Sequence, residues 1–359
     1  MTKEYTALGL MSGTSGDGVD ASIIQSDGQN KYKVILDRYF EYDRNIYKNI
    51  HELKENINSF KDLKNLSKEI TELEKKITLF HAKVVGDLSQ ANIDFLGFHG
   101  QTIFHNADEK ISKQLGDGKL LSQLTRKNVV YNFRENDLRN GGQGAPLTPI
   151  FHKLLVNQNK INLPVTILNI GGIANITSVQ KGNKIFSSDI GPGNCLIDKW
   201  VRSNSDKDYD KDGLFAKAGK INKTILDQSL ENFYENDISK KKSYDIKDFD
   251  LSFAKGLSLE DGAATLTEFT AEIFSKKKMD KKIYICGGGR KNPFLLDRVK
   301  KKINSEIKLI DDLGIDGDFI ESQAFAYLAI RSYLGLPISF PDTTGLKEAS
   351  TGGILVKIK

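Results

Sequence analysis

The sequence predicts an α/β protein built from two similar halves with a cleft between them. Short β-like runs are repeatedly followed by glycine clusters, which is typical of loops gathered at one edge of a sheet. The order strand, glycine turn, strand, strand opens the chain and recurs from Val165, although the residues themselves are not alike. The β-like runs are TALGLM, IDFLGF, VTILNI, KIFSSDI and KIYIC, and the glycine clusters lie at 9–18, 97–100, 141–144, 169–172, 191–193 and 286–289.

Helical stretches separate these strands. In 60–85 the apolar residues are spaced three or four positions apart, which predicts one long helix with a single apolar face. The segment 262–278 predicts a second helix, and 322–335 predicts a third that stops at Gly335, before Pro337.

Composition excludes several classes of protein. The chain of 359 residues carries 52 Lys and Arg against 47 Asp and Glu, a mixture without the footprint of a nucleic-acid-binding protein. No apolar run reaches the roughly 18 residues of a membrane span, so no membrane association is expected. The two cysteines, Cys195 and Cys286, supply no disulfide framework, and we expect a cytoplasmic protein. The 31 glycines beside 7 prolines direct attention to the glycine clusters.

The first cluster that could carry chemistry is GTSGDGVD. Its glycines and hydroxyl residues could surround a phosphate with backbone N–H groups, and Asp17 or Asp20 could hold Mg²⁺ through water. A plain hairpin turn is the alternative. The run also contains the dinucleotide-binding pattern G-x-G-x-x-A, but that pattern needs a following helix, whereas ASIIQ predicts a strand. The residues concerned are Gly13, Thr14, Ser15, Gly16, Asp17, Gly18, Val19 and Asp20.

Two further clusters follow predicted strands. Asp189 precedes a rigid Gly-Pro-Gly turn at a strand end, which suits a general base that deprotonates water or a hydroxyl, although it could instead cap the helix that follows. Gly287, Gly288 and Gly289 precede a helix that begins near Pro293, so free N–H groups could face a phosphate or adenosine; a simple strand-to-helix turn is the alternative.

Polar side chains around 99–144 could bind a small anionic, hydroxyl-rich molecule. They include His99, Gln101 and Arg134, and the two histidines His99 and His105 lack a third residue that would make a metal site. The P-loop, the H-R-D catalytic loop of protein kinases and the hydrolase pattern G-x-S-x-G are all absent from the sequence.

Together these motifs resemble one family, the anhydro-N-acetylmuramic acid kinases of the actin/Hsp70/sugar-kinase superfamily. The resemblance runs from about residue 8 to the TGG at 351–353 and rests on GLMSGTSGDGVDAS, GFHGQTIFH, NFRENDLRNGGQGAPLTPIFH, LNIGGIANIT, DIGPGNCLID, DGAATLTEFTA, CGGGRKNPFLL and SQAFAYLAIR. It implies two duplicated RNase H-like (actin-like ATPase) domains around a central cleft. We expect residues 1–150 to form the first lobe, with 340–359 packing back on it, and 151–339 to form the second.

The resemblance also implies a reaction. 1,6-Anhydro-N-acetylmuramic acid, ATP and water give N-acetylmuramic acid 6-phosphate and ADP, with Asp189 as the catalytic base and Mg²⁺ assisting. The implied nucleotide contacts are Gly13 to Asp20, Gly171, Gly172 and Gly287 to Gly289, and the expected sugar contacts are His99, Gln101, Arg134 and Glu321. We expect a homodimer. The alternatives are another sugar or carboxylate kinase of the superfamily and a nucleotide-switched module like actin or Hsp70.

The sequence departs from the family at two places. Where relatives carry Lys-Ser-Thr-Gly-Arg-Glu, this chain reads KSYDIK from Lys242 to Lys247, before Phe249. The base motif reads DIGPGN where DTGPGN is common, a change that leaves the carboxylate of Asp189 in place.

Overall fold

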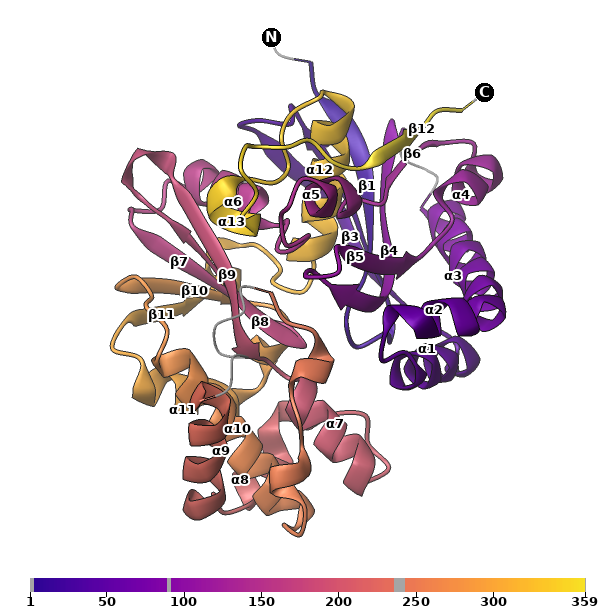
Figure 1. The fold of residues 1–359 in the computed structure, drawn as a ribbon. Coiled ribbons are helices and arrows are strands. Elements are labelled where there is room, and N and C mark those ends of the chain that lie inside the picture. Colours follow the sequence, from indigo (N-terminus) through magenta and orange to yellow (C-terminus); the bar gives the residue numbers. More distant parts are fainter. Residues whose placement is uncertain (1–2, 89–91, 236–242, 359) are drawn as a thin grey trace. The chain divides into compact units, whose positions relative to one another are not determined.

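The computed structural model describes residues 3–88, 92–235 and 243–358. The chain divides into two compact units, which we call unit 1 (residues 1–161 and 319–359) and unit 2 (residues 162–318). Figure 1 shows the helices and strands of both. Each unit is built on one mixed β-sheet, and the two are described separately.

The sheet of unit 1 has the order β12-β6-β4-β1-β2-β3 among the described residues, with β5 paired to β4. Strands β1, β2 and β3 form an antiparallel meander, whereas β4 and β6 continue the sheet in parallel with β1. The strands are β1 (Tyr5–Ser12), β2 (Gly18–Ser26), β3 (Tyr32–Glu41), β4 (Phe95–Asn106), β5 (Ile111–Leu115), β6 (Asn128–Tyr131) and β12 (Ile354–Val356).

The sheet of unit 2 repeats this plan in the order β11-β10-β7-β8-β9. Again the first three strands are antiparallel neighbours, and the next two extend the sheet in parallel. The strands are β7 (Val165–Ile170), β8 (Ile173–Val179), β9 (Ile185–Pro192), β10 (Lys282–Cys286) and β11 (Glu306–Leu309). Two copies of the strand order 3-2-1-4-5 with the same directions confirm the predicted duplicated RNase H-like fold.

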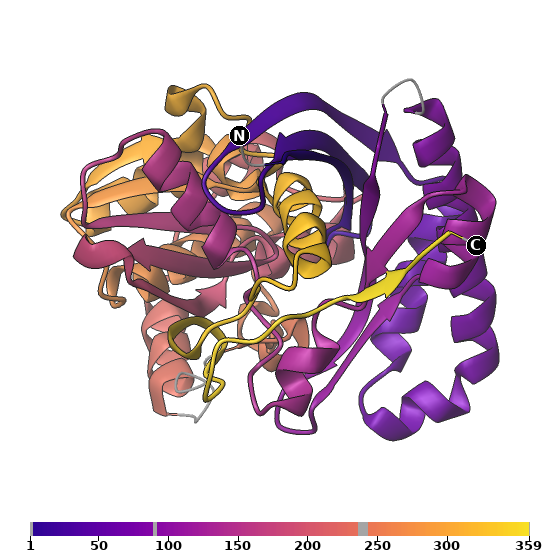
Figure 2. The ribbon, with the colours of Figure 1, turned by 90° about the horizontal axis from the view of Figure 1, so that it is seen from above.

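Helices cover both faces of the unit 1 sheet, as Figure 2 shows from above. On one face Leu8 and Leu10 of β1 join the core formed with α1 and α3. On the other face α12 lies directly on the strands, because Gly9 and Gly97 have no side chain in its way. A Cβ on Gly9 would lie 1.8 Å from the carbonyl oxygen of Ser322. The helices of unit 1 are α1 (Arg44–Asn56), α2 (Phe60–Asn65), α3 (Ser67–Asp87), α4 (Gly118–Thr125), α5 (Glu135–Arg139), α6 (Pro149–Gln158), α12 (Ile320–Tyr333) and α13 (Pro341–Thr344).

Unit 2 has its own hydrophobic core around α10 (Leu259–Ser275), which is buried on nearly every side. The indole N–H of Trp200 donates to the carbonyl of Leu259 at 2.9 Å and ties α7 to the start of α10. The remaining helices are α7 (Cys195–Asn204), α8 (Leu214–Ala218), α9 (Lys223–Glu235) and α11 (Pro293–Lys302).

The observed units differ from the expected lobes 1–150 and 151–339 at both boundaries. Helix α6 belongs to unit 1, where the side chain of Gln158 exchanges two 2.9 Å hydrogen bonds with the backbone of Tyr32. Helix α12 also belongs to unit 1, because it packs on β1, β2 and β4. The segment 340–359 lies in unit 1 as well, where β12 pairs with β6.

The three predicted helices are present, with one correction. The segment 60–85 is not one helix: α2 and α3 meet at Leu66, whose backbone leaves the helical conformation. The buried apolar face lies on α3, at Ile70, Leu73 and Ile77, whereas α2 buries none of its residues. Leu63 of α2 and Leu66 are partly buried against the same core. The other two predictions correspond to α10 and α12.

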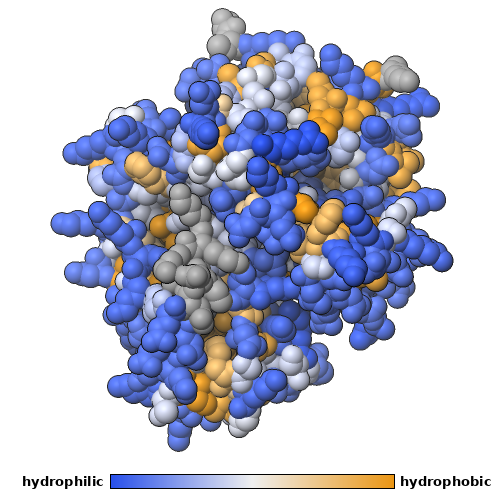
Figure 3. All heavy atoms as spheres, viewed as in Figure 1, coloured by the Kyte–Doolittle hydropathy of each residue, from blue (hydrophilic) through white to orange (hydrophobic). Residues whose placement is uncertain are grey.

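No helix within the described residues is both long enough and apolar enough to cross a membrane. The face drawn in Figure 3 is mostly hydrophilic, and its hydrophobic side chains occur in small separate groups.

Buried histidines give the fold a predictable pH dependence. His81 of α3 is fully buried, its Nδ1–H donates to the carbonyl of Ile77 at 2.8 Å, and its Nε2 has no partner among the described residues. Burial lowers the pKa of His81 to about 4 and that of His152 to about 3. The unfolded chain therefore takes up protons below pH 6.5 that the folded chain refuses, so stability falls as the pH drops from 6.5 toward 4.

We expect His81→Phe to flatten this dependence. Phenylalanine keeps the ring contact with Phe98, whose centroid is 4.8 Å away, and removes the buried Nε2. Between pH 6.5 and pH 4, His81 lowers the unfolding free energy of the wild type by about 1.4 kcal/mol for each pH unit. The variant should not show this decrease. Urea unfolding at pH 7 and at pH 5 gives the unfolding free energy of both proteins. If that free energy falls equally in both proteins between the two pH values, His81 is not the group responsible.

Candidate functional site

The first part of the candidate site is the loop between β1 and β2 of unit 1. Thr14, Ser15 and Asp17 are exposed at its tip, and the N–H of Gly16 closes a turn on the carbonyl of Gly13 at 3.1 Å. The hydroxyl of Ser15 donates to the carboxylate of Asp17 at 2.5 Å. Beyond the tip, β2 begins at Gly18 as a strand, so the helix that a dinucleotide-binding loop would need is absent there. Val19 is fully buried in the core, which leaves only its backbone for a ligand.

Gln101 lies beneath this loop. Its Nε2 donates to the carbonyl of Gly13 at 2.9 Å, and its Oε1 accepts from the hydroxyl of Ser12 at 2.6 Å. The side chain is fully buried and its amide is engaged with the loop. Gln101 therefore supports the loop, and its predicted contact with a sugar stays a prediction.

His99 and Arg134 come together in unit 1. The guanidinium of Arg134 donates to Nε2 of His99 at 2.9 Å and to the carbonyl of Gly144 at 2.8 Å, while Nδ1–H of His99 donates to the carbonyl of Gly100 at 2.7 Å. Burial, and then the charge of Arg134, hold the pKa of His99 well below its usual value. His99 is thus a neutral residue that orients Arg134. The fourth expected sugar contact, Glu321, lies in the first turn of α12.

In unit 2 the glycine turn between β7 and β8 supports the turn that follows Asp189. Three successive N–H groups donate to it: Gly193 and Cys195 bond to the carbonyl of Gly172 at 2.9 and 3.1 Å, and Asn194 bonds to that of Gly171 at 2.8 Å. The Gly-Pro-Gly turn and the start of α7 are therefore fixed to the Gly171–Gly172 turn.

The third glycine loop joins this group at the end of β10. Because β7 and β10 are parallel, their carboxyl ends lie at the same edge of the sheet. A Cβ on Gly289 would come within 2.3 Å of Ile170, so packing alone requires that glycine. Gly288 differs, since the nearest atom to a Cβ placed on it would be Nδ2 of Asn194 at 4.0 Å. The protein's own packing gives no reason for a glycine at position 288.

Asp189 lies on β9, three residues before Pro192, and its side chain is buried. Its carboxylate accepts a 2.9 Å hydrogen bond from the backbone N–H of Tyr244. Tyr244 belongs to the run that departs from the family pattern, of which Lys242 lies outside the described residues. Burial, together with the charges of Asp189 and Asp248, raises the pKa of Tyr244 to about 12, so its hydroxyl stays protonated. The divergent run thus supplies a contact to the candidate base through its backbone, which side-chain changes leave in place.

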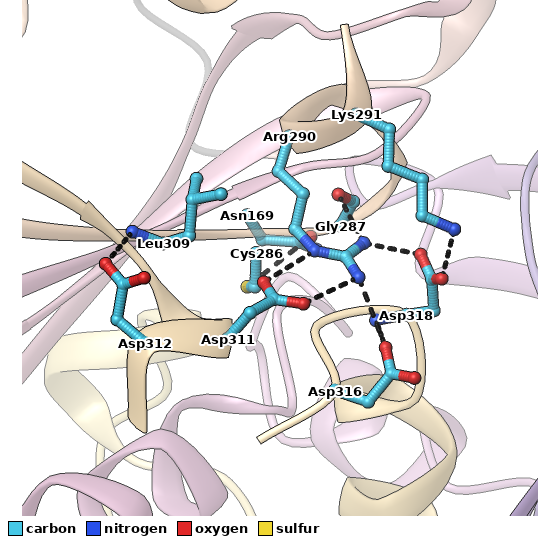
Figure 4. Close-up of polar contacts among 10 residues, drawn as sticks. All are labelled: Asn169, Cys286, Gly287, Arg290, Lys291, Leu309, Asp311, Asp312, Asp316 and Asp318. Carbon is cyan, nitrogen blue, oxygen red and sulfur yellow. Dashed lines mark hydrogen bonds and ion pairs between the residues drawn. The ribbon is translucent and has the colours of Figure 1, made fainter. Parts of the chain in front are cut away.

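An arginine ties the Gly287–Gly289 loop to the segment before α12, as Figure 4 shows. The side chain of Arg290 is 5% exposed and contacts three carboxylates. It meets Asp311 with two hydrogen bonds of 2.8 and 3.1 Å, Asp316 with one of 3.2 Å, and Asp318 with another. Burial opposes the charge of Arg290, but the bonds to Asp311 and Asp318 outweigh it and raise its pKa.

Backbone bonds complete this connection. Arg290 donates to the carbonyl of Gly287 at 3.3 Å, and the N–H of Gly287 donates to the carbonyl of Gly317 at 3.2 Å. The glycine loop is therefore held at both ends by the segment 311–318. Sequence reasoning missed this role of Arg290, although the four aspartates within 311–318 were a visible signal that a cation must lie nearby.

Within the described residues, no group of three or more His, Cys, Asp or Glu side chains could hold a metal ion. Mg²⁺ that accompanies a nucleotide is usually bound by one or two carboxylates together with the phosphates. Asp17 is exposed at the loop tip, and Asp20 is half-buried on β2.

The chain has the duplicated RNase H-like fold that is typical of the actin-like ATPases, with glycine loops at the strand ends. Its relatives identify the family. The chain belongs to the anhydro-N-acetylmuramic acid kinase family, whose model matches residues 5–357. The resemblance inferred from the motifs is thereby confirmed.

Individual relatives agree with this assignment over their whole length. The chain is 58% identical to the anhydro-N-acetylmuramic acid kinase of Pelagibacter ubique, covering 99% of this chain and 100% of that protein. It is 36% identical to the protein of the same name from Agrobacterium fabrum, again covering 99% and 100%. It is 37% identical to that of Zymomonas mobilis, covering 97% and 98%.

Proposed function

We propose that the protein uses ATP and water to convert 1,6-anhydro-N-acetylmuramic acid into N-acetylmuramic acid 6-phosphate and ADP, in the recycling of cell-wall sugars. Family membership over nearly the whole chain supports the reaction. The observation that carries the residue-level proposal is Asp189, a buried carboxylate that accepts a hydrogen bond from the N–H of Tyr244 and lies shortly before the turn fixed to Gly171 and Gly172.

Asp189 is the general base in this proposal. Its carboxylate takes a proton from a water molecule as the water oxygen bonds to C1 of the sugar and the bond between C1 and O6 breaks. O6 then bonds to the γ-phosphorus, and the bond to the β-phosphate oxygen breaks to release ADP. Asp189 suits the first step because the N–H of Tyr244 fixes the orientation of its carboxylate at the strand end.

The glycine loops bind the nucleotide in this proposal. Where glycine replaces a larger residue, the backbone N–H groups of a loop can come close to a phosphate. They then stabilise the negative charge that develops as the phosphoryl group is transferred. The loop at Gly13–Asp17 and the loop at Gly287–Gly289 take these roles in their respective units. Asp17 and Asp20 would hold Mg²⁺, which supplies charge neutralisation on the phosphates.

The proposal is tested by mixing the protein with ATP, Mg²⁺ and the anhydro sugar and following ADP. ADP should form only when the sugar is present, and the product should have both a reducing end and a 6-phosphate. ADP release without the sugar would instead indicate a nucleotide-switched ATPase, and a phosphorylated product that retains the anhydro ring would remove the hydrolytic step.

Gly288 allows a sharper test of the nucleotide loop. Because a methyl group at this position meets no protein atom closer than 4.0 Å, Gly288→Ala should keep the melting temperature of the wild type. If a nucleotide lies against this glycine, the same methyl group should raise KM for ATP about tenfold while KM for the sugar stays unchanged. Steady-state kinetics and a thermal melt measure these quantities, and an unaltered KM for ATP would remove Gly288 from the proposed site.

The expected homodimer and the expected cytoplasmic location are part of this proposal. Two cysteines, one of them buried, are compatible with a reducing compartment. Light scattering of the purified protein measures the oligomeric state.

A further inference from the structure

The loop at 13–16 has an unusual set of anchors within unit 1. Three successive backbone carbonyls each accept a hydrogen bond from a different side chain. Nε2 of Gln101 donates to the carbonyl of Gly13 at 2.9 Å, Nζ of Lys54 to that of Thr14 at 2.8 Å, and Nε2 of His51 to that of Ser15 at 2.9 Å.

These anchors determine where the N–H groups of the loop point. In a trans peptide the C=O of one residue and the N–H of the next point in opposite directions. The anchored carbonyls of Gly13 and Thr14 therefore turn the N–H groups of Thr14 and Ser15 away from α1 and β4. Neither N–H donates to any acceptor in the described part of the chain, and both residues are exposed.

Helix α1 is built to hold the loop in this way. Lys54 comes three positions after His51 and four positions after Ile50 in the sequence. All three residues therefore lie on one face of the helix. Gly16 adopts φ +64°, and a Cβ there would come within 3.0 Å of Ile50, which shows how closely the loop lies on α1. His51 is itself held against Tyr47, with ring centroids 4.4 Å apart.

Lys54 is unusual within this face. It follows Ile46 and Ile50 at intervals of four residues, along the apolar side of α1, and it is itself buried. An apolar residue normally occupies such a position, because burying an ammonium group costs free energy. The ammonium group of Lys54 lies beneath the exposed tip of the loop, where it donates to the carbonyl of Thr14.

We propose that Lys54 and His51, together with Gln101, are positioning residues that aim the N–H groups of Thr14 and Ser15 at a phosphate of a nucleoside triphosphate. The inference rests on the proposed kinase function. Lys54 acts in two ways: it fixes the carbonyl of Thr14, and its ammonium group makes the loop more attractive to an anion. Two adjacent outward N–H groups above a buried cation form an anion site made largely of backbone.

The test compares Lys54→Met with Lys48→Met. Both changes remove one ammonium group from α1, but Lys48 is 70% exposed and pairs only with Glu52 among the ion pairs of the described residues. Lys54→Met should raise KM for ATP and the dissociation constant of ATP about tenfold, because a hydrogen bond that involves a charged group is lost. KM for the sugar should stay within twofold, and Lys48→Met should change neither constant.

His51→Phe provides a second variant that should fold well. Phenylalanine keeps the tilted ring contact with Tyr47 but cannot donate to the carbonyl of Ser15. A rise of severalfold in KM for ATP alone is expected, and Lys54→Arg, which restores the charge and a donor, should recover part of the ATP affinity lost in Lys54→Met.

The possible outcomes separate this inference from the proposed function. If the wild type phosphorylates the sugar but neither Lys54→Met nor His51→Phe changes the affinity for ATP, the loop inference is wrong and the function stands. If both KM values rise together with a lower melting temperature, the residues are merely structural and the inference is again wrong. If the wild type binds ATP without phosphorylating the sugar, the function fails, and the dissociation constants for ATP still decide the inference.

Discussion

Asp189→Asn should lower kcat about a thousandfold, in the range expected for loss of a general base, while the affinity for ATP stays within twofold of the wild type. An amide cannot accept the proton that water must lose as it attacks the sugar. The substitution is otherwise mild, because Oδ1 of asparagine can still accept the hydrogen bond from the N–H of Tyr244 that Asp189 accepts at 2.9 Å. The fold should therefore be unchanged, and the defect should lie in the chemical step.

Two measurements check this expectation. Turnover is followed as sugar-dependent ADP formation, and ATP binding is measured by calorimetry without the sugar. The matched control is Asp206→Asn, which makes the same change in charge in unit 2 at a side chain that is 85% exposed. An Asp189→Asn variant that retained a tenth or more of wild-type kcat would mean that another group removes the proton.

Arg290→Met should destabilise unit 2 by about 2–3 kcal/mol and raise KM for ATP more than tenfold. Removing one partner of a buried ion pair typically costs more, about 3–5 kcal/mol, because a charge is left without compensation. Here Asp311, Asp316 and Asp318 are 28% to 49% exposed, so water can solvate them once the guanidinium is gone. The effect on ATP is expected because Arg290 also holds the carbonyl of Gly287.

Urea unfolding and steady-state kinetics measure these two effects. Lys301→Met on α11 is the matched control, since it removes a cation that is 60% exposed and pairs with Asp297 on the surface, where such pairs contribute about 0–1 kcal/mol. Arg290→Lys should fall between the wild type and Arg290→Met, because lysine keeps the charge but cannot bond to several carboxylates in one plane. Wild-type stability in Arg290→Met would show that the three carboxylates do not depend on this cation.

The sequence predicted the fold well because its signals are local. Strands followed by glycine turns and the repeated order from Val165 indicated two α/β units, and both sheets have the same strand order. The bounds of the compact units differ from those of the expected lobes for a physical reason. Helix α12 follows unit 2 in the sequence but packs on unit 1, and the glycines that make room for it, Gly9 and Gly97, lie more than two hundred residues away. Proximity in the sequence could not reveal that pairing.

The sequence predicted those parts of the candidate site that form short contiguous motifs. The loops at 13–20 and 287–289 and the carboxylate of Asp189 follow from residue type and position. The residues that hold them in place are scattered: Lys54 on α1 reaches the carbonyl of Thr14, and Tyr244 reaches Asp189 with its backbone. A backbone donor leaves no trace in the sequence. Lys54 did leave one, since it interrupts the apolar face that Ile46 and Ile50 begin.

The division of the chain has a consequence for its synthesis on the ribosome. Unit 2 is one continuous stretch, residues 162–318, and is complete once that stretch has emerged. Unit 1 is not, because the sheet face that contains Gly9 and Gly97 is covered by α12, and β6 is paired by β12. The sheet face that contains Gly9 and Gly97 therefore stays uncovered until α12, residues 320–333, has been translated. Unit 1 can therefore complete its fold only after the whole of unit 2 has been translated.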